Sequence, residues 1–263
     1  YSKEHLLYLN RLKRNNILVH AVRIAVLLAF LLLWELSARF EWINPFITSS
    51  PSRIWDTVVS LYKNGTLFYH VGTTLWETLL GFFIAVVLGY GIALLLWWSE
   101  GFRKIAEPYL VVLNALPKIA LGPLIIIWCG TGSKPIVFMT ILIGLIVAIL
   151  NMLNGFMETD ENKILLLRSM GAGKRQILTK LVVPSSLPAF ISMLKINVGM
   201  AWIGSVMGEY MVSKAGIGYL IVYGGQVFKL DLVMTAVVIL CLLAAGMYAI
   251  VALVEKAVIK NTR

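Results

Sequence analysis

Five apolar runs, each about as long as a bilayer is thick, dominate this chain of 263 residues. A spanning helix needs about 20 mostly apolar residues, because the hydrocarbon core is about 30 Å thick. Charged residues make up only 14% of the chain, whereas soluble domains contain about a quarter. The sequence therefore predicts an integral membrane protein. Its clear spans are 18–38, 78–98, 135–157, 185–211 and 232–254.

A sixth apolar run, 109–130, is interrupted by Pro117, Lys118 and Pro123. Proline is tolerated in a membrane helix where neighbouring protein satisfies the freed carbonyl groups. We therefore expect a broken or kinked span that faces the bundle interior. With it, the predicted fold class is an all-α integral membrane protein with six transmembrane helices.

The distribution of Lys and Arg predicts the orientation of these spans, since cytoplasmic loops carry an excess of both. With the N-terminus inside, fourteen of these residues fall in cytoplasmic segments and six outside, which predicts that both termini are cytoplasmic. The six outside are Arg39, Arg53, Lys63, Lys134, Lys214 and Lys229. The net charge of +10 thus follows the membrane-orientation pattern, and no nucleic-acid partner is expected.

The polar segments complete the predicted organisation. Residues 1–17 place three leucines at intervals of three, which favours a short amphipathic helix on the cytoplasmic membrane surface over a disordered basic tail. Residues 39–71 lie outside, with a short helix that Ser50 caps and Pro51 begins. Five spans form a core at 72–255, and 256–263 form a cytoplasmic tail.

A basic loop at 158–184 separates two of the core spans, and it is longer than most helix connections. Thr159 or Asp160 can cap a first short helix that runs to Met170, and Gly171 ends it. A second short helix is expected from Lys174 to Pro184. Two short helices joined at a glycine form a rigid knob, which predicts docking into a groove on a soluble protein.

The chain lacks the motifs of an enzyme. The sequence G-A-G-K at 171–174 resembles the end of a phosphate-binding loop, but Arg168 stands in place of the required first glycine and Arg175 in place of the Ser or Thr. The G-x-G at Gly216 and Gly218 has Ile221 at the third position. We therefore predict no catalytic residues, no metal site and no ATPase activity in this chain.

Four polar residues in or near the spans are candidates for lining a translocation pathway: Asn114, Lys118, Lys195 and Glu209. A charge at bilayer depth costs about 2.5–3.5 kcal/mol, so such residues usually face a cavity or pair with one another. Alternatively, the charged residues lie near the interfaces or form structural pairs, and the asparagine bonds between helices. Small residues at Gly81, Ala85 and Gly89, and at Gly199, Ala201 and Gly204, permit close helix packing.

Several stretches carry a resemblance to a known family. In the loop, Gly171 is followed by Val183-Pro184 and then Leu187-Pro188. Three further stretches outside the loop are T-L-W-E-T-L-L-G (74–81), N-A-L-P-K-I-A-L-G-P-L-I-I-I-W (114–128) and A-W-I-G-S-V-M-G-E-Y-M-V-S-K-A-G-I-G-Y-L (201–220). Together they resemble type I permeases of bacterial ABC importers, in the nitrate, sulfonate and taurine branch. Leu165-Leu166-Leu167 stands where that family has Glu-Ala-Ala, so an acidic contact is missing.

The resemblance implies a homodimer in the bacterial inner membrane, with two ABC ATPase subunits on the cytoplasmic face and an extracytoplasmic binding protein. ATP and Mg would be bound by the ATPases, with no cofactor in this chain. The implied coupling residues are Arg168, Ser169, Met170, Gly171, Ala172, Gly173, Lys174 and Arg175. The solute would be a small anion such as a sulfonate, taurine or nitrate; alternatively, it is a vitamin or a thiamine or riboflavin precursor. A self-sufficient secondary transporter or channel would need an internal inverted repeat, and none was found.

Overall fold

The computed structural model describes the backbone of residues 3–260 and the side chains of residues 14–257 apart from Asn16 and His20. Every regular element in this range is helical. The α-helices are α1 (Lys3–Arg39), α2 (Pro45–Thr48), α3 (Pro51–Lys63), α4 (Leu67–Trp98), α5 (Glu100–Ala115), α6 (Gly122–Cys129), α7 (Ser133–Met157), α8 (Glu161–Ser169), α9 (Lys174–Ile177), α10 (Val183–Ser185), α11 (Leu187–Val212), α12 (Ile217–Gln226) and α13 (Leu230–Lys260).

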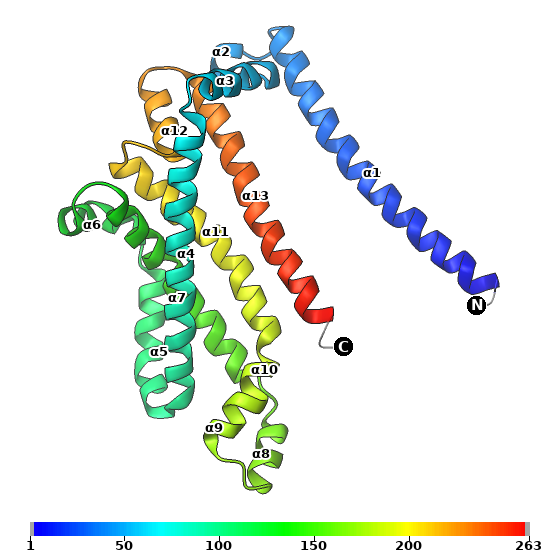
Figure 1. Cartoon of the computed structure of the whole chain (residues 1–263), viewed down its shortest axis with the longest axis vertical. Helices are drawn as coiled ribbons and strands as arrows, with labels where there is room; N and C mark the ends of the chain where they lie inside the picture. Colours follow the sequence, from blue (N-terminus) through cyan, green and yellow to red (C-terminus); the bar gives the residue numbers. More distant parts are fainter. Residues whose placement is uncertain (1–2, 261–263) are drawn as a thin grey trace.

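Three long helices, α4, α7 and α11, form the centre of the bundle (Figure 1). Their buried side chains are mostly large and apolar, including Phe82, Met152, Phe156 and Met193. The helix α7 makes extensive contacts with both α4 and α11. It is therefore the central helix of this group of three.

Glycines bring the backbones of these three helices close together. A Cβ atom at Gly81 of α4 would lie 2.5 Å from the Thr140 Cβ, and one at Gly204 of α11 would lie 2.5 Å from the Thr140 Cα. Gly89 of α4 is similarly close to Ala148 of α7. Small residues allow this approach because they leave no side chain between the helices. The predicted close packing thus involves Gly81, Gly89 and Gly204 within one chain, while Gly199 faces open space.

Five helices are long and apolar enough to cross a membrane, and a bent pair supplies the sixth candidate span. The pair consists of α5 and the segment Lys118–Cys129, which comprises a short 3₁₀ turn (Lys118–Leu121) and α6; the two parts meet at 83°. Pro117 lies at the break, where its missing N–H and the restricted residue before it end the helix. The predicted interruption is therefore present, and the helix before it begins at Glu100 rather than at 109.

The first span differs from its prediction in one respect. A separate surface helix was expected at 1–17, but α1 continues without a break from Lys3 to Arg39. The leucine side chains on which that expectation rested, and the last residues of the 256–263 tail, lie outside the described part. Figure 1 shows α1 standing apart from the other spans, joined to them through α2 and α3. Its apolar side chains, such as Leu28 and Leu32, are exposed, so lipid or another protein must cover them.

The helices α2 and α3 lie across one end of the bundle, which we call the α3 end (Figure 1). Ser50 caps α3 by accepting a hydrogen bond from the Arg53 N–H at 3.4 Å, and Pro51 is the first helical residue, as predicted. An ion pair of 2.7 Å between Arg53 and Asp231 joins α3 to α13. This ion pair attaches the segment of α2 and α3, which leads from α1, to the last span, α13.

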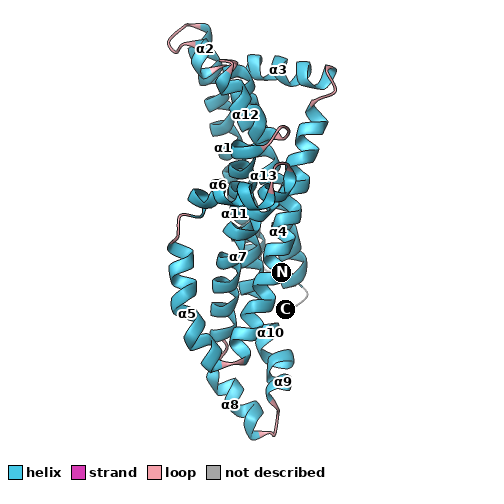
Figure 2. Cartoon of the chain, turned by 90° about the vertical axis from the view of Figure 1, so that its left-hand side faces the viewer, coloured by secondary structure: helices cyan, strands magenta, loops and turns pink. Residues whose placement is uncertain are grey.

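At the opposite end, which we call the loop end, α8 and α9 project beyond the spans (Figure 2). The start of α1 and the end of α13 are directed toward this same end. An even number of passes is expected for a chain whose ends share a side. Counting the broken pair of α5 and α6 as one span gives six candidate spans, which is an even number.

Replacing Gly204 with alanine tests the glycine packing. The new methyl group would meet the Thr140 backbone, and overpacking of this kind costs about 1–3 kcal/mol. We expect a lower free energy of unfolding for Gly204→Ala in mixed-micelle denaturant titrations. Gly199→Ala, on the same helix with nothing within 4 Å, is the matched control. Equal stability of the two variants would contradict the packing.

Candidate functional site

The basic loop at 158–184, which lies at the loop end of the bundle, has the helix–glycine–helix form expected from its sequence. The Asp160 side chain caps α8 by accepting a hydrogen bond from the Asn162 N–H at 2.9 Å. The helix ends at Ser169, and Gly171 follows with φ of +81°, a conformation that favours glycine. The second part is less regular than predicted, because α9 continues through a π-helical turn (Leu178–Val182) into α10.

The inner face of this loop is packed against the spans. Ile177 and Val182 are 3% and 0% exposed, and both belong to the same apolar cluster as Met152 and Phe156 of α7. Ala172 packs against the edge of that cluster. The loop is therefore packed against the spans through the apolar side chains of its inner face.

The opposite face of the loop exposes large apolar side chains. Leu165, Leu166 and Met170 are 63%, 61% and 75% exposed, and Arg168 and Arg175 are exposed beside them. We call these five residues the loop patch. A grouped apolar surface with basic residues around it is typical of a protein-binding site.

Lys174 is the predicted loop residue with a partner in the bundle. Its Nζ donates a hydrogen bond to the Trp98 carbonyl oxygen at 2.5 Å and lies 5.8 Å and 5.4 Å from the rings of Trp97 and Trp98. Next to it, the Gly173 N–H donates to the Gln176 side chain at 2.9 Å. Ser169 donates to the Leu165 carbonyl within α8. Lys174 thus lies against the end of α4, and Arg168 lines the same groove with Trp97.

At the α3 end, side chains from two spans cap the start of α12. The Gly216 N–H donates to His70 Nδ1 at 3.1 Å, and the Ile217 N–H donates to Thr74 Oγ1 at 2.7 Å. The Gly218 N–H donates to Glu209 Oε2 at 2.5 Å. The first N–H groups of a helix have no partner within the helix, and a carboxylate there is favoured by the helix dipole. These bonds therefore fix α12 to α4 and α11.

Glu209 is deeply buried in this arrangement, with Glu77 of α4 beside it. Both residues are 1% exposed. Thr78 donates to Ser205 nearby at 2.7 Å, again linking α4 to α11. Gly216 has φ of +106°, and a Cβ atom there would collide with the Glu209 carboxylate. The G-x-G of the sequence is explained by this close approach.

The other predicted pathway residues lie apart from Glu209. Lys118 is at the bend, where its Nζ donates to the Asn114 carbonyl oxygen at 3.1 Å, so these two residues come together. Lys195 forms an ion pair of 2.6 Å with Glu255, which joins α11 to α13. In the described part of the chain, no hydrogen bond or ion pair links Lys195 or Glu209 to Lys118. Their role in a pathway stays a prediction.

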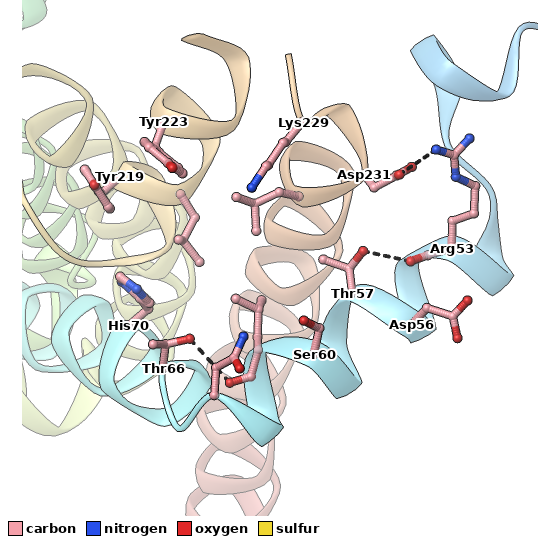
Figure 3. A pocket seen from close by; sticks show the side chains of 14 residues that line it. Arg53, Asp56, Thr57, Ser60, Thr66, His70, Tyr219, Tyr223, Lys229 and Asp231 are labelled. Carbon is pink, nitrogen blue, oxygen red and sulfur yellow. Dashed lines mark hydrogen bonds and ion pairs between the residues drawn. The ribbon is translucent and has the colours of Figure 1, made fainter. Parts of the chain in front are cut away.

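A cavity of about 730 Å³ opens at the α3 end between α3, α4, α12 and α13. Figure 3 shows His70, Tyr219 and Tyr223 on one side and Arg53 and Asp231 on the other. The His70 and Tyr219 rings are stacked with centroids 6.0 Å apart, and Tyr219 stacks on Tyr223 at 5.8 Å. Tyr219 belongs to the quoted stretch 201–220, but the sequence did not predict that it groups with His70 and Tyr223, because the fold alone brings the three residues together.

The bundle of membrane-length helices defines the chain as a multi-pass membrane protein. Its particular family follows from comparison with known proteins. Residues 81–260 match the model of the binding-protein-dependent transport system inner membrane component, and the chain belongs to that family. It is thus a multi-pass inner-membrane permease of the ABC transporter class, as the sequence predicted.

Similar proteins agree with this assignment. The chain is 33% identical to the formylaminopyrimidine transport permease protein ThiX of Halalkalibacterium halodurans, over 73% of this chain and 76% of the relative. It is 24% identical to the taurine transport system permease protein TauC of Escherichia coli, over 84% and 82%. The fold matches an inward-facing structure of the MetNI methionine ABC transporter with a TM-score of 0.63 and 19% identity, covering 73% of this chain and 97% of that one.

Proposed function

We propose that this permease forms a homodimer that binds two ATPase subunits through the loop patch and imports a small solute by ATP-driven alternating access. The observation that carries the proposal is the two-sided loop. One face is buried against the spans through Ile177 and Val182, and the other exposes Leu165, Leu166 and Met170. Such a loop can receive a partner on its outer face and pass that partner's movement to the bundle.

The proposal places the loop end in the cytoplasm. The excess of Lys and Arg in the corresponding segments supports this orientation. The start of α1 and the end of α13 are directed toward the same end, so they would share the cytoplasmic side with the loop. The α3 end then faces an extracytoplasmic binding protein, which delivers the solute. The same orientation puts the loop patch within reach of cytoplasmic ATPases.

ATP and Mg are proposed to bind to the partner ATPases. This is supported by Arg168 and Arg175, which replace the glycine and hydroxyl residue that a phosphate-binding loop requires. It is also supported by the position of Lys174, whose amine is directed to the Trp98 carbonyl. The chain therefore contributes mechanical coupling rather than hydrolysis.

Docking of the ATPase is proposed to rest on apolar contact. Leu165, Leu166 and Leu167 stand in place of the family's acidic tripeptide, and two of these leucines are exposed in the loop patch. Arg168 and Arg175 would supply charge at the rim. An apolar centre with a polar rim is the usual anatomy of a stable protein interface.

Replacing Met170 with aspartate tests this interface. Met170 follows the end of α8 and is 75% exposed, so the change should leave the fold intact while placing a charge within the proposed contact. Loss of a central interface residue costs about 2 kcal/mol or more, which is roughly a 30-fold loss of affinity. We expect a co-expressed ATPase that co-elutes with the wild-type chain to be lost with Met170→Asp.

Gln226→Glu is the control for that experiment, because it adds the same charge at an exposed position of α12, at the α3 end and far from the loop patch. Retention of the ATPase by Met170→Asp would show that the loop patch is not the docking surface. Absence of ATPase binding by the wild-type chain, together with uptake that follows an ion gradient, would instead favour a self-sufficient secondary transporter.

The proposed solute is a small organic or inorganic anion, such as a sulfonate, taurine or nitrate. Lys118 supports this proposal, because its amine lies at the break between α5 and α6, and broken membrane helices commonly form solute sites. A thiamine precursor is the second candidate, since a relative with 33% identity is named for formylaminopyrimidine transport. The two candidates differ in charge and can be separated.

Replacing Lys118 with methionine separates them. Removal of one charged contact costs about 1.4 kcal/mol or more, a tenfold effect, so uptake of labelled taurine by the reconstituted importer should fall about tenfold. Uptake of formylaminopyrimidine should be unchanged. Lys134→Met, at an exposed position at the start of α7, is the control. Unchanged taurine uptake in Lys118→Met would remove this residue from the pathway.

A further inference from the structure

Among the side chains that the structure describes, the anchored loop forms one hydrogen bond to a distant part of the chain. Lys174, the first residue of α9, reaches Trp98, the last residue of α4, across 76 positions in sequence. We call the contact of the Lys174 amine with the Trp98 carbonyl and the Trp97 and Trp98 rings the Lys174 clamp. It is a direct link between the loop and a central spanning helix.

The Trp98 carbonyl is available because α4 ends there. The Ser99 N–H bonds back to the Leu95 carbonyl, and the Ser99 side chain accepts from the Phe102 N–H to start α5. The last carbonyls of a helix lack partners within it and carry the negative end of its dipole, so an ammonium group is favoured there. The two indole rings add cation–π attraction. Three groups therefore hold one amine.

The helix that Lys174 contacts, α4, runs through the whole bundle. The 32 residues of α4 form one helix from Leu67 to Trp98, without the break that divides α5 from α6. At its far end, His70 and Thr74 hold the Gly216 and Ile217 N–H groups of α12. A displacement of α4 at Trp98 would thus act on α12 at the α3 end.

From this geometry we infer that Lys174 is a positioning residue that transmits movement of the loop to α4 and, through α4, to α12. The inference rests on the proposed function, in which an ATPase moves the loop. Apolar packing at Ile177 also attaches the loop, but apolar surfaces can slide past one another. A hydrogen bond with defined direction to the end of α4 fixes the position of the loop along that helix.

The test measures movement at the α3 end of α4. Phe68, which is 69% exposed there, is replaced by cysteine and spin-labelled, with Cys129 and Cys241 replaced by alanine. The full permease–ATPase complex is placed in lipid nanodiscs. The distance between the labels of the two copies is measured without nucleotide and after trapping with ATP, Mg and vanadate. The wild-type complex is expected to show a shift between the two states.

Lys174→Met is expected to keep ATPase binding and hydrolysis within about twofold of wild type and to lose more than half of the label shift. Lys174→Arg should retain most of the shift, because guanidinium can also donate to the carbonyl. Lys180→Met, which removes an exposed charge of the same loop outside the loop patch, should show the full shift. If Lys174→Met does not assemble, Lys174→Gln is used, whose shorter side chain should give the same loss.

A full label shift in Lys174→Met or Lys174→Gln would overturn the inference while leaving the proposed function intact. A shift lost equally in Lys180→Met would also overturn it, because the effect would then follow the charge of the loop and not the clamp. A wild-type chain that binds no ATPase would refute the proposed function itself. The two failures are therefore distinguishable.

Discussion

The backbone contact of α4 and α11 with α7 is the constraint on which the rest of the structure depends. Thr140 lies between Gly81 and Gly204, and neither glycine could carry a side chain without displacing it. Within a bilayer, burial of apolar surface gives helices little reason to associate, so close packing and polar contacts must supply the attraction. The three central helices meet this requirement with glycines along their length and with the hydrogen bond from Thr78 to Ser205.

The three central helices, α4, α7 and α11, hold a different segment at each end of the bundle. At the loop end, apolar burial of Ile177 and the Lys174 clamp hold α9 against the spans. At the α3 end, His70, Thr74 and Glu209 hold the first turn of α12. Because α4 takes part in both attachments, it joins the surface where a cytoplasmic ATPase is proposed to act to the surface that is proposed to face a binding protein.

The sequence predicted those features that depend on local chemistry. The apolar runs located the spans, Ser50 and Asp160 marked helix starts, and Gly171 marked the turn of the loop, because each of these signals acts over a few residues. Pro117 likewise predicted a break, whereas the angle of 83° depends on how α6 packs afterwards. The continuity of α1 was missed, since a basic segment at its start reads equally well as a separate surface helix.

The partners of the charged residues could not be predicted in the same way. Lys195 pairs with Glu255, and Lys174 bonds to Trp98, over 60 and 76 positions in sequence. Glu209 caps a helix only because Gly216 allows the chain to approach it closely. Such contacts depend on which helices become neighbours, so a single sequence identified the residues without identifying their partners.

The most direct measurement of the central claim, that the loop patch is the ATPase docking surface, is site-specific photo-crosslinking. A photoreactive residue placed at Leu166 in the native membrane complex should give a crosslinked product that contains the ATPase, while the same residue at Lys229, at the α3 end, should not. A product with the ATPase from Lys229, or none from Leu166, would contradict the assignment of the loop patch.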